Sequence, residues 1–292
     1  RTPLLVYKSA SVISRLEEMA ATGIYPSVLN SYIRNPIDFY FRKILRIGEV
    51  DEVEENIALN TLGTIIHETL RVLYSPFVGQ KITAENLKEK IAQIDDQVLH
   101  QFKEVYKEGE IKKGRNLLAF EVAKRNIYNF IQSEIKQIEQ GDEVEIIALE
   151  QTFTRTFTHP NLHLPITFSG NIDRIEKRNG QLRIIDYKTG KVDKNQLIIS
   201  DWSGLVQEIK NDKIIQILLY AYVFLSHDPS ASLEAGIISF KNLKAGFMPF
   251  TFKADQEFLT QITDQNLTDF MQEIVGLLHE IFDAQVPFEE KL

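Results

Sequence analysis

Residues 170–190 read Gly170-Asn-Ile-Asp173-Arg-Ile-Glu-Lys-Arg-Asn179-Gly180-Gln-Leu-Arg-Ile-Ile-Asp186-Tyr-Lys188-Thr-Gly190. Two apolar-rich segments flank Asn179-Gly180, and this dipeptide is typical of a type I′ turn, in which both central residues need positive φ. The stretch therefore predicts a β-hairpin with a two-residue loop.

The register of this hairpin predicts a cluster of charges on one face. With a two-residue loop, Arg178 pairs with Gln181, and Asp173 lies opposite Asp186. Opposed residues hold their Cβ atoms about 4.5–5.5 Å apart, and like charges in that position destabilise a sheet. Lys188 lies two residues after Asp186 and shares its face. We therefore expect a divalent cation between the carboxylates, with Lys188 positioning a water molecule or offsetting charge in the transition state.

An alternative interpretation treats Asp173 and Asp186 as exposed carboxylates with Lys188 as a salt-bridge partner. Against it, a hydrophobic central strand is a costly place for charges that have no function. The apolar residues around the two carboxylates are Ile172, Ile175, Ile184 and Ile185.

In the rest of the chain, hydrophobic periodicity predicts mostly helices before residue 140 and strands after it. Helices are expected at 28–33 (after Ser27), 35–47, 60–74, 84–140 (two or three, split near Gly114), 212–225 and 255–284. Strands are expected at 143–157, 164–177, 181–188, 233–240 and 247–252. This order predicts an α/β fold, a mixed sheet with helices on its faces.

Composition indicates an ordinary globular protein, with 43% apolar and 25% charged residues among 292. We expect a single domain over 1–292: a helical part and insertion over about 1–140, a β-rich core over about 141–253, and a final helix over about 255–285. The chain has no cysteine, which excludes disulfides, thiolate metal sites and iron–sulfur clusters, and which fits a reducing compartment such as the cytoplasm.

The formal net charge of −8 at first argues against a nucleic-acid partner. Carboxylates gathered around a cation add negative charge where phosphate binds, so net charge is a poor guide here. One basic cluster reads as solvated surface: Lys107, Lys112, Lys113 and Arg115. A second cluster, Lys188, Lys191 and Lys194, lies beside the proposed site.

The sequence contains no recognisable targeting or membrane-spanning segment. The most apolar stretch, Ile214 to Leu225, falls short of the roughly 20 residues that a membrane helix needs. The first residue is Arg1, not methionine, so we expect that the chain is a segment of a longer protein.

Several motifs together resemble the RecB-like branch of the PD-(D/E)XK nucleases. Gly-x-Ile-Asp-Arg-Ile at 170–175 and Ile-Ile-Asp-Tyr-Lys-Thr-Gly at 184–190 carry the resemblance first. Gly63-Thr-Ile-Ile-His67 is similar to the family's Gly-x-x-x-His helix, and Gln216-Ile-Leu-Leu-Tyr220 to its Gln-x-x-x-Tyr motif. The segment 27–40 is similar to its Ser-x-Leu-x-x-Tyr signature with Cys-Pro-x-x-Phe. The matches run in family order from Ser27 to about Tyr220.

The resemblance implies a restriction-endonuclease-like αβββαβ core, here with a helical insertion, and cleavage of DNA with Mg²⁺ or Mn²⁺. It implies metal ligation by His67, Asp173, Asp186 and the backbone carbonyl of Tyr187. Several relatives hold an iron–sulfur cluster with a cysteine before the proline and three near the C-terminus. Asn35 precedes Pro36 here and no cysteine exists, so no such cluster can form. We expect the long last helix to brace the fold in place of that cluster.

For the weaker candidate residues, a structural interpretation stays open beside the functional one. His67 alone reads as a structural histidine, and only the motif order favours a ligand. Gln216 and Tyr220 project from one helical face, either as substrate or Lys188 contacts or as a solvated glutamine and a core tyrosine. Glu150 is a further candidate for the site. His159 and His163 have metal-like spacing without a third ligand, so a loop is favoured.

The leading hypothesis is a DNA nuclease from a repair or recombination system of the helicase–nuclease type. No Gly-x-x-x-x-Gly-Lys-Ser/Thr run is present, so a helicase or motor domain would be a partner or another part of a longer chain. One alternative is an inactive DNA-binding or scaffolding module on the same fold. Another is a glycosidase with a carboxylate pair, which leaves Lys188 and His67 without roles. The choices of DNA or RNA, single or double strand, and internal or terminal cleavage stay open.

Overall fold

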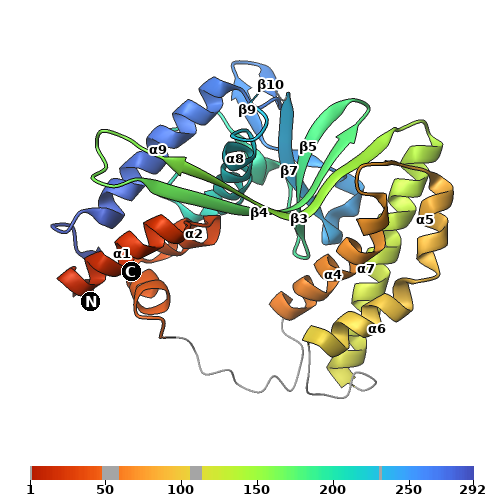
Figure 1. Ribbon diagram of the computed structural model, residues 1–292, viewed down its shortest axis with the longest axis horizontal. Coiled ribbons are helices and arrows are strands. Elements are labelled where there is room, and N and C mark those ends of the chain that lie inside the picture. The colour runs from red at the N-terminus through yellow and green to blue at the C-terminus, as the bar shows by residue number, and fades with distance from the viewer. Residues whose placement is uncertain (1, 48–58, 106–113, 230–231) are drawn as a thin grey trace.

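The structure is a computed structural model that describes residues 2–47, 59–105, 114–229 and 232–292 (Figure 1). Two sequence features lie outside these residues. They are the acidic segment from Glu49 to Glu55 and most of the first basic cluster, namely Lys107, Lys112, Lys113 and the side chain of Arg115.

A six-stranded mixed sheet runs through the middle of the molecule (Figure 1). Its order is β2-β3-β4-β5-β7-β8, and every neighbouring pair is antiparallel except β5 and β7, which are parallel. Together with the helices on its faces, this sheet confirms the predicted α/β fold. The strands are β2 Lys81–Ile82, β3 Val144–Phe157, β4 Ile166–Arg178, β5 Gln181–Lys188, β7 Leu233–Ser239 and β8 Met248–Pro249.

The β4–β5 hairpin has the predicted turn and register. Asn179 and Gly180 have φ values of 52° and 82°, as a type I′ turn requires. Arg178 pairs with Gln181, and the pairing continues to Arg174 opposite Ile185, where it ends. The next step in that register places Asp173 opposite Asp186, as the sequence predicts.

Two hydrophobic clusters lie on opposite faces of the sheet because side chains alternate along each strand. On β5, Ile184 belongs to the first core, which also holds apolar residues of the N-terminal helices, α8 and α9. Its neighbour Ile185 belongs to the second core, which is built with α4, α5, α6 and α7. The strands between them are therefore covered on both sides.

The helical insertion lies between the first core helix and the sheet strands. Helix α4 spans Leu59–Tyr74, and the described part of 84–140 forms three helices, with the last beginning at Gly114 as expected. Figure 1 shows α4 to α7 gathered beside one end of the sheet, away from α1, α2 and α9. The insertion helices are α5 Ala84–Ile91, α6 Ile94–Val105 and α7 Gly114–Glu139.

Helix α8, Asp212–Phe224, contains the most apolar stretch of the chain, and its residues from Ile217 to Phe224 are all buried. It packs against β3, β4 and β7 and so supplies much of the first core. Among the residues that the structure describes, no helix has the length and apolar character needed to cross a membrane.

The N-terminal helices differ slightly from the prediction. Helix α1 spans Ala10–Thr22, and α2 spans Pro26–Arg34, beginning before Ser27 because Pro26 occupies the first helical turn. The predicted helix at 35–47 is α3, Pro36–Phe39, capped by the side chain of Asn35, followed by a π-helical turn at Tyr40–Ile44.

The final helix is shorter than predicted. Helix α9 spans Asp264–Phe282 and does not begin at Asp255, because Thr263 and Asn266 form a reciprocal capping box at its start. Asp255 instead has a φ of 54° and lies in the turn between two antiparallel strands. These strands are β9 Thr251–Ala254 and β10 Glu257–Leu259.

The strand predicted at 247–252 is also divided. Its first part is β8, which pairs with β7 as expected. Its second part is the start of β9, which joins a separate three-stranded sheet with β10 and with β6, Ile198–Ile199. Phe250 lies at the division and is 1% exposed, so the chain changes sheets around a core aromatic residue.

The two ends of the chain are joined. Strand β1, Leu5–Val6, pairs antiparallel with β11, Phe288–Glu289. The ring of Phe288 lies 5.8 Å from that of Phe39 and 5.5 Å from that of Tyr40. Lys291 Nζ donates to the carbonyl oxygen of Ile33 at 2.6 Å.

Candidate active site

The sequence-predicted site residues gather where β4 and β5 stop pairing. Asp173 is the first β4 residue beyond the last pair, and it is 6% exposed. Its Oδ2 accepts a hydrogen bond of 2.7 Å from the main-chain N–H of Tyr187. The carboxylate of Asp173 thus links the two strands beyond their last paired residues.

His67 reaches the same point from α4. Its Nδ1 lies 3.5 Å from Asp173 Oδ1 and 3.6 Å from Glu150 Oε1. Its ring meets that of Tyr187 edge to face, with centroids 5.8 Å apart. The Gly63-to-His67 helix therefore brings its histidine to the carboxylates of the sheet, as the resemblance implies.

Glu150 joins this group from β3. The pairs on either side of it, Leu149 with Arg174 and Gln151 with Ile172, place it opposite Asp173. Its φ is 45°, a left-handed conformation that is uncommon for residues other than glycine. Its Oε2 also accepts a hydrogen bond of 2.9 Å from Asn171 Nδ2. Glu150 was only a weak candidate in the sequence, because the alternation of side chains along a strand gives no sign of this conformation.

Asp186 and Lys188 form a second, adjoining part of the site. Lys188 Nζ lies 2.8 Å from Asp186 Oδ2 and donates at 2.8 Å to Gln216 Oε1. The amide nitrogen of Gln216 donates to Asp186 Oδ1 at 3.1 Å and to the Tyr220 hydroxyl oxygen at 2.9 Å. Gln216, on α8, therefore contacts Lys188, Asp186 and Tyr220 through its side-chain amide.

A close approach between β4 and α8 fixes Tyr220. A Cβ atom added at Gly170 would lie 2.7 Å from Tyr220 Cδ1 and 3.3 Å from Val223 Cγ2. The first glycine of the quoted stretch is needed because the tyrosine ring occupies the space of a side chain.

The charges of the site perturb one another. Burial lowers the pKa of His67, but the charges of Asp173 and Glu150 and hydrogen bonds to both outweigh it and raise the pKa to about 10. Burial raises the pKa of Asp186 to about 6; Asp173 adds to this shift, and Lys188 opposes it. Burial lowers the pKa of Lys188, yet Asp186 and Asp173 hold it above its ordinary value, so Lys188 is charged at neutral pH.

The donor set fits a divalent cation. Ligand atoms of His67, Glu150 and Asp173 all lie within 4.8 Å of one another. Opposite ligands of an ion with bonds of about 2.1 Å are about 4.2 Å apart, so small movements would close the group around Mg²⁺ or a similar ion. An imidazole among carboxylates also tolerates Mn²⁺.

Two predicted ligands lie outside that group. Asp186 stands close enough for its pKa to respond to Asp173 and His67, but it is held by Lys188 and Gln216. The carbonyl oxygen of Tyr187 lies 3.2 Å from His67 Nε2. Ligation by either residue stays a prediction.

The other candidates lie apart. Among the described residues, one group of three potential ligands is close enough to hold a metal ion, His67, Glu150 and Asp173, and His159 and His163 do not belong to it. Residues 159–163 follow the end of β3 outside any strand or helix, as the loop interpretation expects. Lys191 lies 3.3 Å from Asp193 on the surface.

Comparisons with known proteins identify the family of the chain. Residues 25–291 match the family model of the PD-(D/E)XK nuclease superfamily. An uncharacterised protein of Rickettsia typhi is 26% identical over 187 residues, covering 58% of this chain and 19% of its own length. One from Rickettsia bellii is 23% identical over 193 residues, covering 61% and 20%. The chain thus spans about a fifth of the length of these curated relatives.

A crystal structure of SSO0001 covers 91% of this chain and 88% of its own, with 12% identity and a TM-score of 0.25, too low to support any likeness of fold. The family model extends over both the helical insertion and the sheet, from α2 to the final strand β11, Phe288–Glu289. The chain therefore belongs to the PD-(D/E)XK nuclease superfamily.

Proposed function

We propose that this chain is a deoxyribonuclease of the RecB-like branch that hydrolyses phosphodiester bonds with Mg²⁺ or Mn²⁺. The observation that carries the proposal is the meeting of His67, Glu150 and Asp173 directly beside the Asp186–Lys188 pair. The motif order, with His67 on α4 and Gln216 and Tyr220 on α8, supports the RecB-like branch. Resemblance to that branch, whose members usually cut DNA, supports the substrate.

In this proposal His67, Glu150 and Asp173 hold the cation, and Asp186 and the Tyr187 carbonyl complete its surroundings. The bound ion would polarise a phosphoryl oxygen and lower the pKa of a water molecule. Lys188 keeps its proton beside Asp186, so it acts as a fixed positive charge that offsets charge developing on the phosphate.

Gln216 and Tyr220 would position the remaining groups. Gln216 fixes the Lys188 ammonium and the Asp186 carboxylate relative to each other through one amide. Tyr220 accepts from Gln216 with its oxygen. Its hydroxyl hydrogen is thereby left to donate to a substrate oxygen, which is the role we assign to it.

The wider setting is also a proposal. The matched relatives are about five times longer than the region that resembles this chain, which supports a nuclease part within a helicase–nuclease type of repair system. Partners would then be DNA and a helicase or motor domain. The absence of cysteine supports work in the reducing cytoplasm.

The test is cleavage of labelled single-stranded DNA, double-stranded DNA and RNA by the purified chain with Mn²⁺ or Mg²⁺, with and without EDTA. We expect DNA cleavage that EDTA stops and that Asp186→Ala abolishes while circular dichroism shows a preserved fold. Equal cleavage by wild type and Asp186→Ala would reject this active site. Absence of calorimetric Mn²⁺ binding in the wild type, with no difference in Asp173→Asn, would favour the alternative of a DNA-binding scaffold.

A further inference from the structure

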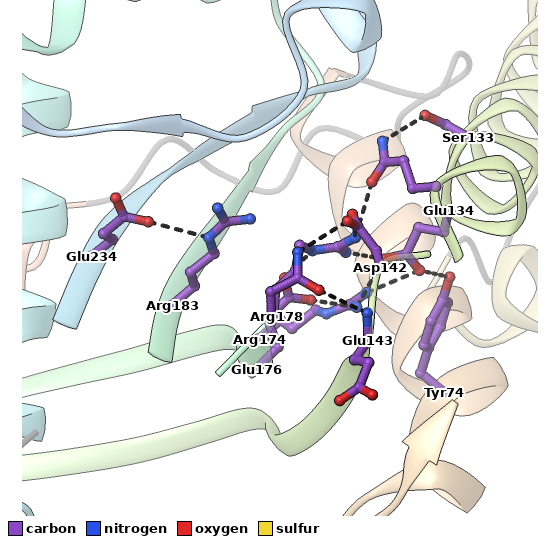
Figure 2. Close-up of polar contacts among 12 residues, drawn as sticks. Tyr74, Ser133, Glu134, Asp142, Glu143, Arg174, Glu176, Arg178, Arg183 and Glu234 are labelled. Carbon is purple, nitrogen blue, oxygen red and sulfur yellow. Dashed lines mark hydrogen bonds and ion pairs between the residues drawn. The ribbon is translucent and has the colours of Figure 1, made fainter. Parts of the chain in front are cut away.

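Four charged side chains form a buried network: Glu134, Arg174, Glu176 and Arg178 (Figure 2). The three that belong to β4 alternate with Asp173 along the strand and so lie on the opposite face. Arg174 Nη2 lies 2.8 Å from Glu134 Oε1 and 2.5 Å from Glu176 Oε2. Arg178 lies 3.0 Å from the same Glu134 oxygen and 2.9 Å from Glu176 Oε1. Arg174 is 0% exposed and Glu134 is 3% exposed. Two positive and two negative charges are therefore balanced away from solvent.

The network ties the helical insertion to the sheet. Glu134 belongs to α7, and it accepts a hydrogen bond from the hydroxyl of Tyr74 at the end of α4. The Arg174 guanidinium carbon lies 5.0 Å from the centre of the Tyr74 ring. Glu134 thus joins α4, α7 and β4 at one point.

The same network contacts the backbone that forms the metal centre. Arg174 directly follows Asp173 in the chain, and its Nη1 donates to the Tyr187 hydroxyl at 3.4 Å. The main chain of Tyr187 in turn donates its N–H to Asp173 and lies with its carbonyl oxygen 3.2 Å from His67. Tyr187 is therefore held on one side by the network and on the other by the site.

Stability alone does not account for four buried charges. Replacing a buried ion pair by apolar side chains of similar volume is often neutral or stabilising, because desolvation offsets the attraction. What a forked guanidinium adds is direction, since its paired N–H groups fix the position of a carboxylate. The distinctive contribution of Arg174 and Glu134 is therefore the placement of β4 and β5 relative to the helices.

We propose that Glu134 is a positioning residue for the metal centre. Acting through Arg174 and Tyr187, it holds Asp173 and the Tyr187 main chain at the place where His67 meets them. The helical insertion, through α7, thereby sets the geometry of the cation site. This inference rests on the proposed metal-dependent function and assigns a role to a side chain that does not touch the ion or the substrate.

The test measures Mn²⁺ affinity of the full chain by isothermal titration calorimetry. Glu134→Gln keeps the shape of the side chain and removes its charge, which leaves Arg174 and Arg178 short of one partner. We expect the Kd for Mn²⁺ to rise about tenfold or more, the range seen when residues behind metal ligands are changed. In cleavage assays, kcat should fall while the KM for DNA stays unchanged.

A matched control separates positioning from stability. Tyr32→Phe keeps the ring in the first core and removes a hydroxyl that donates to the exposed Glu280 at 2.8 Å. This variant should lower Tm without changing the Kd for Mn²⁺. If Glu134→Gln does not fold, Arg174→Lys keeps the positive charge, loses the two-nitrogen contact with Glu134, and is expected to raise the Kd in the same way.

The outcomes test the positioning role of Glu134 and the proposed metal-dependent function separately. Wild-type Mn²⁺ affinity in a folded Glu134→Gln or Arg174→Lys variant overturns the positioning role and leaves the proposed function intact. Loss of Mn²⁺ affinity in Tyr32→Phe to the same extent also overturns it, because the effect would then follow from stability. Absence of Mn²⁺ binding in the wild type overturns the proposed function, and the positioning role with it.

Discussion

His67 Nε2 lies 3.2 Å from the main-chain carbonyl oxygen of Tyr187, while the Nδ1 of the same ring faces two carboxylates. A ring that donates from both nitrogens carries a proton on each, in agreement with the raised pKa of His67. In the absence of a cation, the proton on Nδ1 supplies the positive charge between Asp173 and Glu150. Under the proposed function, metal binding and protonation of His67 therefore compete.

The first prediction concerns proton release. Because the pKa of His67 is raised to about 10, the ring is protonated near neutral pH and must lose a proton to become a ligand. Mn²⁺ binding should release about one proton, and its affinity should rise about tenfold per pH unit below that pKa. Calorimetry in buffers of different ionisation enthalpy measures the release. His67→Gln should bind more weakly and release none; a heat independent of the buffer in the wild type would contradict the competition.

The second prediction concerns stability in the metal-free protein. The pKa of His67 is raised from 6.5 to about 10, so its stabilising contribution is complete below about pH 6.5 and is lost as the pH rises through about 10. Tm measured with EDTA should fall across that window. His67→Gln should lack this part of the decline. Parallel Tm curves for the two proteins would show that His67 is not paired with the carboxylates.

The third prediction concerns Lys188. Its ammonium contacts Asp186 and Gln216 but is not a metal ligand, so Lys188→Met should keep Mn²⁺ affinity and lose kcat. Loss of one group that stabilises transition-state charge costs about 10²–10³-fold. The control is Lys191→Met, an exposed lysine paired with Asp193, which should cleave DNA at the wild-type rate. Unchanged kcat in Lys188→Met would remove Lys188 from the mechanism.

The fourth prediction concerns Gly170. A methyl group there would lie 2.7 Å from the Tyr220 ring, so Gly170→Ala should displace Tyr220 and its contact with Gln216. We expect a loss of about 1–3 kcal/mol in the free energy of unfolding and reduced cleavage. Gly276→Ala is the control, since no atom would lie within 4 Å of its new methyl group on α9. It should stabilise the protein by up to about 1 kcal/mol. Urea unfolding measures both, and equal effects would refute the packing argument.

The fifth prediction concerns the joined termini. Phe288 is 0% exposed among the rings of Tyr32, Phe39 and Tyr40, and Lys8 Nζ lies 4.9 Å from its centre. Phe288→Ala should cost about 3–5 kcal/mol in the free energy of unfolding, the range for a buried aromatic residue. Phe258→Ala, at a ring that is 60% exposed, should cost far less. A small loss in Phe288→Ala would mean that the ends contribute little to stability.

The junction includes Asn35, the position at which the resemblance to the RecB-like branch expects a cysteine. Asn35, which stands in place of the cysteine before the proline, donates from its side chain to the carbonyl oxygen of Lys291 at 3.5 Å. Tyr32 donates to Glu280 near the end of α9. Contacts of the last helix and the final strand therefore join the two ends, and their role as a replacement for a cluster stays a prediction.

The hairpin was predictable because its turn chemistry is local. Asn179-Gly180 sets the loop, and strand alternation then fixes which side chains face each other, so Asp173 and Asp186 follow from the sequence. The true start of α9 was also signalled locally, by the capping pair Thr263 and Asn266. The apolar spacing of residues 255–263 hid it, because a short hairpin and a helix can show the same pattern there.

Two parts of the site were not predictable in this way. The left-handed backbone of Glu150 falls between the pairs Leu149–Arg174 and Gln151–Ile172, and no residue type in this part of β3 predicts it. The charges of Arg174, Glu176 and Arg178 alternate along β4, and the sequence gives no sign that they are buried. Their burial depends on α7, whose partner Glu134 lies 40 residues earlier in the chain than Arg174.

Because the insertion helices separate His67 from Glu150 in the chain, the group of His67, Glu150 and Asp173 is completed late in synthesis. A nascent chain that has emerged only as far as the end of α7 contains His67 but neither Glu150 nor Asp173. Under the proposed function, such an incomplete product cannot cut nucleic acid. Hydrolytic activity would arise only after β4 has emerged and folded back onto α4, which spares the cell from truncated but active forms of a destructive enzyme.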